Sequence, residues 1–388
     1  EKARMCRTVK ENEWSEVIKR KLVTSSDGET VFTFRARLQH FDAETKAFSI
    51  YMTAAKNLYK EVTPKAYARE LEEIDEVAPT NAHGAFIWQK DSEADVYLDC
   101  EDFVFDWHRK VIAAAIGKHD NDIIFDSCGL IDTVNHRFRS IYEEVGEGWG
   151  GTKEQADAVY ERAYKMVDKH ISWLMDNACD ENTVFAIFSD HGSVGWSETE
   201  NHCKALEKAG LIVYTDDREE SRSWENKNVD WTKTRAYPVG SCHINVNLKG
   251  REPCGIVEEK DFEDTVNEII DALYGGIKTA DGKINGTAFA VDGSQAGFVG
   301  LGGENCGDVV YGIKGSRLGG FYGQVHGTQI PSARTKTGDI RALCIMSGKC
   351  FKENAVLERP TDLTDFAPTL CYAMKYPQPA DATGGVVF

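Results

Sequence analysis

The sequence has no apolar run that approaches the ~20 residues needed to cross a bilayer, so it predicts no transmembrane helix. The chain begins at Glu1, and no apolar core of a signal peptide follows. Its eleven cysteines include no C-x-x-C pair and no short regular spacing. This odd, scattered set disfavours a disulfide framework and a structural zinc cluster, and we therefore expect reduced thiols in a cytoplasmic protein.

Basic residues are in the minority. The chain has 45 Lys and Arg against 63 Asp and Glu, a formal net charge of -18. Nucleic acids and anionic membranes would be repelled by such a surface, so we expect neither as a partner. A small phosphorylated substrate remains compatible with this charge, because bound metal cations can dominate the field inside a pocket.

Internal repeats and low-complexity segments are also lacking. With 388 residues and 41% hydrophobic residues, the chain can form one large α/β domain with an insertion, or two smaller domains. Residues 1–80 differ from the rest, because Glu29–Leu38 and Lys46–Thr53 alternate like strands and Lys65–Ile74 is a helix candidate after Pro64. We interpret residues 1–80 as a β-rich insertion or cap.

Residues 81–388 alternate between helix and strand patterns, which is typical of a mainly parallel sheet with helices on both faces, the α/β class. Thr152 and Gln155 form a capping box before a long helical periodicity. Predicted helices are Phe103–Gly117, a helix opening at Asp132, the helix after Thr152, Lys204–Ala209, Glu258–Tyr274 and Thr364–Met374. Predicted strands are 123–131, 184–188, Leu211–Tyr214, Cys242–Leu248 and Arg341–Met346.

The strand at 184–188 is apolar throughout and is followed by Asp190, His191 and Gly192. Such a run predicts a central strand covered on both faces. Ligands of open α/β sheets bind at the carboxyl ends of strands, where a carboxylate and an imidazole are well placed to hold a metal ion. Taken alone, the tripeptide favours an ordinary polar turn, because such tripeptides occur by chance in many chains.

A second pair and a single histidine strengthen the metal-site hypothesis. Asp132 suits a helix N-cap, and His136 follows one turn later on the same face, so the two can bind one cation. His326 lies much later, in a glycine-rich segment between Gly323 and Gly327 that allows close approach of the backbone to a ligand.

The chain contains Asp-x-x-x-His, then Asp-His-Gly after a strand, then a lone His, and this order resembles the alkaline phosphatase superfamily. The resemblance is to its type I phosphodiesterase/nucleotide pyrophosphatase-like members and to its bacterial phosphohydrolase or phosphomutase types. The resemblance covers residues 81–388 and implies a three-layer α/β/α sandwich that binds two divalent cations. It assigns Asp132, His136 and His326 to one cation, and Asp190 and His191 to the other. Mixed Asp and His ligands favour zinc or manganese.

The catalytic nucleophile of such enzymes has no clear counterpart. In the family, an Asp and then a Thr, Ser or modified Cys precede the Asp-x-x-x-His motif. Asp27 and Thr53 have the right types and order, but Asp27 falls in a turn pattern and Thr53 in a strand pattern. We therefore expect this chain to be the carboxyl-terminal part of a longer protein, associated with a nucleophile-bearing segment upstream of Glu1.

The resemblance implies a metal-dependent hydrolase of phosphate mono- or diesters, acting by two-metal in-line displacement on a small-molecule substrate. A phosphomutase of the same superfamily would use the same ligands. A sulfatase is less favoured, because no Cys-x-Pro-x-Arg or Ser-x-Pro-x-Arg signature is present. A non-catalytic subunit that keeps the fold is the alternative from another class.

The remaining histidines are not predicted as ligands. His170 falls on the apolar face of its predicted helix and is interpreted as a core residue. His202, four residues after Glu198, is a reserve ligand candidate, but a pair on a helix surface is the favoured interpretation. The other histidines have no partner at ligand spacing: His40, His83, His108, His119 and His243.

Overall fold

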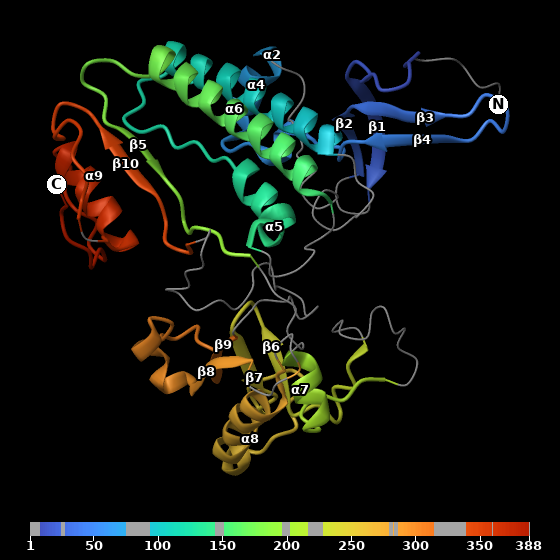
Figure 1. Cartoon of the computed structure of the whole chain (residues 1–388), viewed down its shortest axis with the longest axis vertical. Helices are drawn as coiled ribbons and strands as arrows, with labels where there is room; N and C mark the ends of the chain where they lie inside the picture. Colours follow the sequence, from blue (N-terminus) through green and yellow to red (C-terminus); the bar gives the residue numbers. More distant parts are fainter. Residues whose placement is uncertain are drawn as a thin grey trace. The chain divides into compact units, whose positions relative to one another are not determined.

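The computed structural model describes residues 8–24, 28–74, 94–143, 151–195, 202–215, 228–278, 282, 286–313, 339–358 and 360–387. The backbone forms two compact units (Figure 1). The first unit contains Glu1–Phe138, Trp149–Asp190 and Ala342–Phe388, and therefore includes the β-rich N-terminal segment. The second unit contains Arg139–Gly148 and His191–Arg341.

Two antiparallel hairpins begin the first unit. β1 (Ile18–Thr24) pairs with β2 (Gly28–Phe34), and β3 (Ala36–Phe41) pairs with β4 (Phe48–Met52). Each hairpin is a separate two-stranded sheet. The predicted β-rich character of this segment is therefore confirmed within its described residues.

The boundaries predicted for this segment were partly correct. The predicted strand Glu29–Leu38 is divided at Arg35 into β2 and β3, and Lys46–Thr53 corresponds to β4. β1 was missed, because three consecutive basic residues, Lys19, Arg20 and Lys21, leave it without an apolar alternation. The predicted helix Lys65–Ile74 is α2, and it follows the short helix α1 (Leu58–Glu61).

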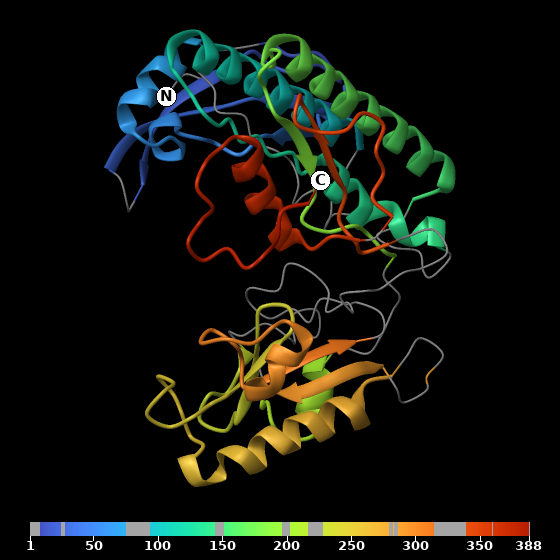
Figure 2. The ribbon, with the colours of Figure 1, turned by 90° about the vertical axis from the view of Figure 1, so that its left-hand side faces the viewer.

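Long helices supply many of the buried apolar side chains of the first unit. α4 (Ala94–Lys118) and α6 (Lys153–Asn177) lie side by side in both views (Figures 1 and 2), and α5 (Leu130–Glu143) precedes α6 along the chain. Their apolar faces supply these buried side chains: Leu98, Phe105, Ile112, Leu130, Val134, Phe138, Ala156, Val159, Ala163 and Met166. The predicted helix Phe103–Gly117 is confirmed as part of the longer α4.

α6 begins at the predicted capping box. The Thr152 side chain accepts a hydrogen bond from the backbone N–H of Gln155 at 3.2 Å, and Oε1 of Gln155 accepts one from the backbone N–H of Thr152 at 2.9 Å. Both bonds satisfy N–H groups that the first turn of a helix leaves without intrahelical partners.

Replacing Thr152 with Ala removes this side-chain acceptor. We expect the free energy of unfolding to fall by about 1 kcal/mol, the usual contribution of a Thr N-cap. Urea unfolding followed by circular dichroism at 222 nm measures this change. Thr152→Ser retains the hydroxyl, and an equal loss of stability in Thr152→Ser would contradict the capping explanation.

The predicted strand at 123–131 is not a strand. Residues 123–129 have no regular secondary structure, and α5 already begins at Leu130. Ile123 and Phe125 are 66% and 73% exposed, although their apolar character predicted burial. An apolar run does not specify a pairing partner, and none of the described strands pairs with this segment.

β5 (Phe185–Phe188) is the strand predicted at 184–188, but its environment differs from the prediction. It pairs antiparallel with β10 (Cys344–Ser347), the predicted strand Arg341–Met346, in a two-stranded sheet. Its side chains are only partly buried, so a central position covered on both faces is not confirmed. Phe188 packs against Phe366 at the start of α9 (Phe366–Ala373), with 4.0 Å between ring centroids.

The second unit contains a four-stranded antiparallel sheet in the order β6-β7-β9-β8. Its strands are β6 (Ala236–Val239), β7 (His243–Val246), β9 (Val309–Ile313) and β8 (Thr287–Asp292). The helix α8 (Phe262–Gly276) packs on this sheet and contacts α7 (His202–Lys208). The predicted helix Glu258–Tyr274 is confirmed, with the 3-10 turn η3 (Glu259–Asp261) as its first part.

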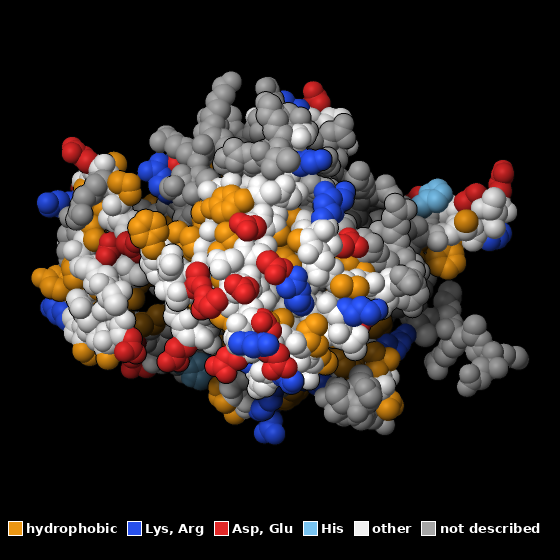
Figure 3. Space-filling view, turned by 90° about the horizontal axis from the view of Figure 1, so that it is seen from below, with side chains coloured by type: hydrophobic (Ala, Val, Ile, Leu, Met, Phe, Trp, Pro, Cys, Tyr) orange, Lys and Arg blue, Asp and Glu red, His pale blue; other side chains and the backbone are white. Residues whose placement is uncertain are grey.

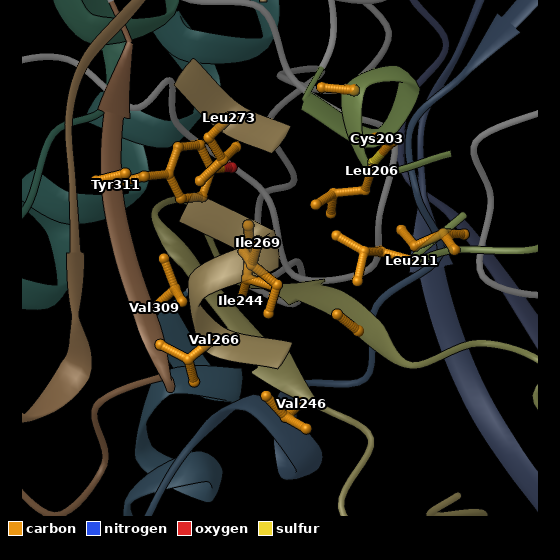
Figure 4. Close-up of a cluster of buried hydrophobic side chains, with 14 of the residues drawn as sticks. Cys203, Leu206, Leu211, Ile244, Val246, Val266, Ile269, Leu273, Val309 and Tyr311 are labelled. Atoms are coloured by element: carbon orange, nitrogen blue, oxygen red, sulfur yellow. The ribbon is translucent and has the colours of Figure 1, made fainter. Parts of the chain in front are cut away.

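The hydrophobic core of the second unit lies between α8 and the sheet (Figure 4). Ile269 of α8 faces Ile244 of β7, and both are fully buried. The predicted strand Leu211–Tyr214 contributes Leu211 and Ile212 to this core but forms only one bridge, between Tyr214 and Val229.

Every pairing between the described strands is antiparallel, and the sheets are small. The chain thus combines helices and sheets, as the α/β prediction requires, but a mainly parallel three-layer sandwich is not confirmed. Alternation of helix and strand along a sequence is also compatible with helices packed on one face of an antiparallel sheet, which is the arrangement of the second unit.

Charged groups of both signs are interspersed on the face shown in Figure 3. α8 contributes exposed acidic side chains, and one of them, Glu268, pairs with Arg235. Within the described ranges, none of the helices has the length and apolar character required to span a bilayer.

Candidate metal ligands

Asp132 and His136 lie one turn apart on α5, as predicted. Oδ2 of Asp132 is 3.3 Å from Nε2 of His136, and the two side chains are 38% and 31% exposed. The predicted N-cap role of Asp132 is wrong, because the helix begins two residues earlier and Asp132 lies in its first turn. An acidic residue there still interacts favourably with the positive end of the helix dipole.

The separation of these two atoms fits joint coordination of one ion. Ligand bonds to zinc are about 2.0–2.1 Å long, so two ligands at a tetrahedral angle lie roughly 3.3 Å apart. The partial exposure of both side chains leaves the pair accessible to an ion and a substrate. The pair can therefore supply two ligands without rearrangement of the helix.

Asp190 and His191 follow β5 directly. Asp190 is exposed, and His191 is half-buried. Nδ1 of His191 lies 2.8 Å from the carbonyl oxygen of Gly192. A carbonyl can only accept, so Nδ1 of His191 is the donor in this contact. This backbone contact supplies the outer partner that metal-binding histidines usually have.

Gly192 is required by close packing of the backbone. Its N–H donates to the carbonyl oxygen of Ile340 at 2.7 Å. A Cβ atom at this position would lie 1.9 Å from the carbonyl oxygen of Asp339 and 2.5 Å from that of Arg341. The glycine of the Asp-His-Gly motif therefore lets residues 339–341 pass next to His191.

Replacing Gly192 with Ala should force these two backbone segments apart. We expect a loss of about 1–3 kcal/mol in the free energy of unfolding, the usual cost of overpacking. Urea denaturation measures this loss. Gly297→Ala is the matched control, because a Cβ there meets no atom within 4 Å. Equal stability of Gly192→Ala and Gly297→Ala would contradict the packing argument.

The other predicted site residues are less informative. Asp27 and His326 lie outside the described residues. Thr53 follows β4, and its Oγ1 accepts a hydrogen bond from the backbone N–H of Arg35 at 3.0 Å. The backbone N–H of Thr53 donates to the carbonyl oxygen of Arg35 at 3.0 Å, so Thr53 extends the pairing of β3 with β4.

Several histidines for which the sequence predicted no partner make a polar contact in the fold. His40 lies 3.2 Å from Glu11, His119 lies 2.9 Å from Glu70, and Nδ1 of His243 accepts from the backbone N–H of Gly307 at 3.1 Å. These partners are distant in sequence and leave no spacing signature. His83 and Glu198 lie outside the described residues.

His202 does not lie on the helix surface. It is the first residue of α7 and is 1% exposed, with its ring 5.2 Å from that of Tyr311. The prediction of a surface pair is therefore wrong, because the face of α7 that begins at His202 packs into the core of the second unit. Burial lowers the pKa of His202 to about 3.

His170 is buried, as predicted, but it belongs to a polar cluster. Its Nε2 lies 2.6 Å from Oδ2 of Asp126, and Nδ1 of His108 lies 2.7 Å from Oδ1 of the same carboxylate. In the described part of the chain, these three residues form the one group of metal-ligating side chains whose ligand atoms all lie within 4.8 Å of one another. Sequence spacing gave no sign of this group.

The cluster holds an ionised carboxylate. Burial alone would raise the pKa of Asp126, but the adjacent imidazoles of His108 and His170 outweigh burial and hold that pKa well below its usual range. Asp126 is therefore negatively charged at neutral pH, and its charge faces two nitrogen atoms that can bind either protons or a metal.

Comparison with known proteins agrees with the resemblance drawn from the motifs. Residues 128–310 match the model of the family described as type I phosphodiesterase / nucleotide pyrophosphatase. The match includes Asp132, His136, Asp190 and His191. No curated protein matches the chain. Over residues 128–310, this chain is therefore similar to the type I phosphodiesterase/nucleotide pyrophosphatase family, a member of the alkaline phosphatase superfamily.

Proposed function

We propose that this protein hydrolyses phosphate mono- or diesters of small molecules with the help of two divalent cations, zinc or manganese. The family is one of metal-dependent phosphoester hydrolases, and four of the five proposed ligands fall inside the matched residues. The observation that carries the proposal is the Asp132–His136 pair, whose 3.3 Å separation suits two ligands of one ion.

We assign Asp132, His136 and His326 to one cation, and Asp190 and His191 to the other. Residues 81–388 would form the metal-binding core, with residues 1–80 as a β-rich cap. The presence of both carboxylates and imidazoles favours zinc or manganese over calcium, which prefers oxygen ligands.

Each described ligand has a distinct part in this proposal. When bound, a pair of cations activates the attacking group and stabilises the charge on the leaving oxygen. The carboxylates of Asp132 and Asp190 would offset positive charge, so that the site is not strongly cationic before substrate binds. His191 is held by the carbonyl of Gly192, and His136 is held on α5 beside Asp132. We do not assign the nucleophile to Thr53, because its hydroxyl serves the backbone of Arg35.

The test combines metal content with hydrolysis. We expect the protein, after treatment with EDTA, to regain bound metal and hydrolysis of bis(4-nitrophenyl) phosphate or 4-nitrophenyl phosphate when zinc or manganese is added. His136→Gln should lower both metal content and rate, the rate by more than about tenfold, since even the outer partners of metal ligands contribute 10–100-fold. His119→Gln is the matched control, because this histidine pairs with Glu70 on the surface.

Two outcomes would reject parts of the proposal separately. Full metal content in His136→Gln would reject the ligand assignment. Full metal loading of the unaltered protein without turnover of either phosphate ester would reject the hydrolase activity. Faster turnover of 4-nitrophenyl sulfate than of the phosphate esters would favour a sulfatase.

A further inference from the structure

Three elements of the first unit bring His108, Asp126 and His170 together. His108 lies on α4, Asp126 lies in the segment between α4 and α5, and His170 lies on α6. The carboxylate of Asp126 is placed between the two rings, with one oxygen toward each. Two imidazoles and one carboxylate form a donor set of the kind that proteins use for zinc.

Burial makes this group different from a surface ion pair. The side chain of His170 is 4% exposed, and those of His108 and Asp126 are each 21% exposed. Nδ1 of His170 is buried and has no hydrogen-bond partner among the described residues. Because the ionised Asp126 can only accept, Nε2 of His170 donates its proton to Oδ2 of Asp126 at 2.6 Å, and a bound metal ion would take the place of that proton.

The contact of His108 with Asp126 differs from that of His170, which has hydrogen-bond geometry. Its Nδ1 is 2.7 Å from the carboxylate, yet the direction of approach does not satisfy hydrogen-bond geometry with any described residue. A nitrogen atom at this distance from a carboxylate needs either a hydrogen atom or a cation between the two. A proton on Nδ1 can take this place, and so can a metal ion bound by both groups.

Glu101 adds a second carboxyl group near the cluster. It lies seven residues before His108, on the same face of α4, and is 4% exposed. Burial raises the pKa of Glu101 to about 7, although the charge of His108 lowers it in part. A cation in the cluster would stabilise the ionised form of this carboxyl group, which burial otherwise disfavours.

We propose that His108, Asp126 and His170 bind a zinc ion that is separate from the cations of the catalytic site. Three protein ligands are sufficient for a stable zinc site, and the fourth position is available to water. The ion would join α4 and α6 to the segment that leads into α5. Because Asp126 lies only six residues before Asp132, this link would also hold the start of α5 in place.

The alternative is that hydrogen bonds alone hold the cluster together, without a metal ion. A variant that lacks the proposed catalytic cations, called the background variant, distinguishes the two explanations. His136→Ala combined with His191→Ala removes one ligand from each proposed catalytic cation. After EDTA treatment and dialysis against zinc, we expect this double variant to retain one zinc ion per chain by elemental analysis. It should also show a higher thermal midpoint with zinc than with EDTA. Absence of both bound zinc and the thermal shift would overturn the proposal.

The ligands are then tested with substitutions that preserve the contacts. Gln can place an amide nitrogen near the position of Nε2, and Asn can do so near that of Nδ1, so His170→Gln and His108→Asn retain donors toward Asp126. In the background variant, each should lose the remaining zinc ion and the thermal shift, while its thermal midpoint in EDTA stays close to that of the background. Zinc retained by either folded variant would overturn the assignment. If one variant does not fold, the other decides.

Discussion

Replacing Asn247 with Asp is expected to destabilise the second unit by about 3 kcal/mol or more. Asn247 is 1% exposed. Its side-chain amide donates to the carbonyl oxygens of Thr234 at 2.8 Å and Cys254 at 3.0 Å. An ionised Asp cannot donate, so two buried carbonyl groups would lose their partner and face a negative charge. Each lost hydrogen bond leaves a buried carbonyl group without a partner, and the buried negative charge further lowers the free energy of unfolding.

Trp231 provides a probe of this unit, because it packs against the same core. Urea unfolding followed by tryptophan fluorescence should therefore show a lower midpoint for Asn247→Asp. Asn267→Asp makes the same chemical change on the exposed face of α8, where the expected effect is within about 0.5 kcal/mol. Similar midpoints for Asn247→Asp and Asn267→Asp would show that the amide of Asn247 is not essential to the fold.

Features set by neighbours in the sequence were predictable. The capping box of Thr152 and Gln155 needs only residues three apart, and the contact between Asp132 and His136 needs only one helical turn. Helix α2 was located from its periodicity and from Pro64 before it. In each case the interacting groups lie within a few residues, so the geometry of a helix alone brings them together.

Features that depend on distant partners were not predictable. The apolar run at 184–188 identified a strand, but nothing in it specifies that β10 is the neighbour or that the pairing is antiparallel. The run at 123–131 has similar composition and forms no strand. Hydrophobic character reports a tendency toward burial, whereas strand formation also requires hydrogen bonds from another segment.

The same limit applies to the candidate sites. Asp190 and His191 were proposed as ligands because they follow an apolar strand. The close packing that requires a glycine at position 192 is visible only in the fold. His108, Asp126 and His170 lie on three elements and share no spacing, so only the tertiary structure identifies them as a group. His202 was misplaced for a related reason, since a polar residue at the start of a helix usually lies on the surface, yet α7 buries it.

The buried His202 should make the second unit sensitive to acid. Burial lowers the pKa of this histidine to about 3 in the folded state, whereas an unfolded chain has the ordinary value near 6.5. Between pH 6.5 and pH 3, the imidazole of His202 is therefore protonated in the unfolded state and neutral in the folded state. The contribution of His202 to stability is complete above pH 6.5 and declines as the pH falls toward 3, by about 1.4 kcal/mol per pH unit.

Between pH 8 and pH 5, this linkage amounts to about 2 kcal/mol of lost unfolding free energy. Urea unfolding monitored through Trp231 at several pH values measures the slope. His202→Gln has no titrating group, so its stability should depend less on pH by this amount, even if its stability at pH 8 is lower. His40→Gln removes a histidine that is 66% exposed and should leave the slope unchanged. A steep acid loss that persists in His202→Gln would assign the pH sensitivity to other groups, such as His243, whose pKa is also lowered by burial.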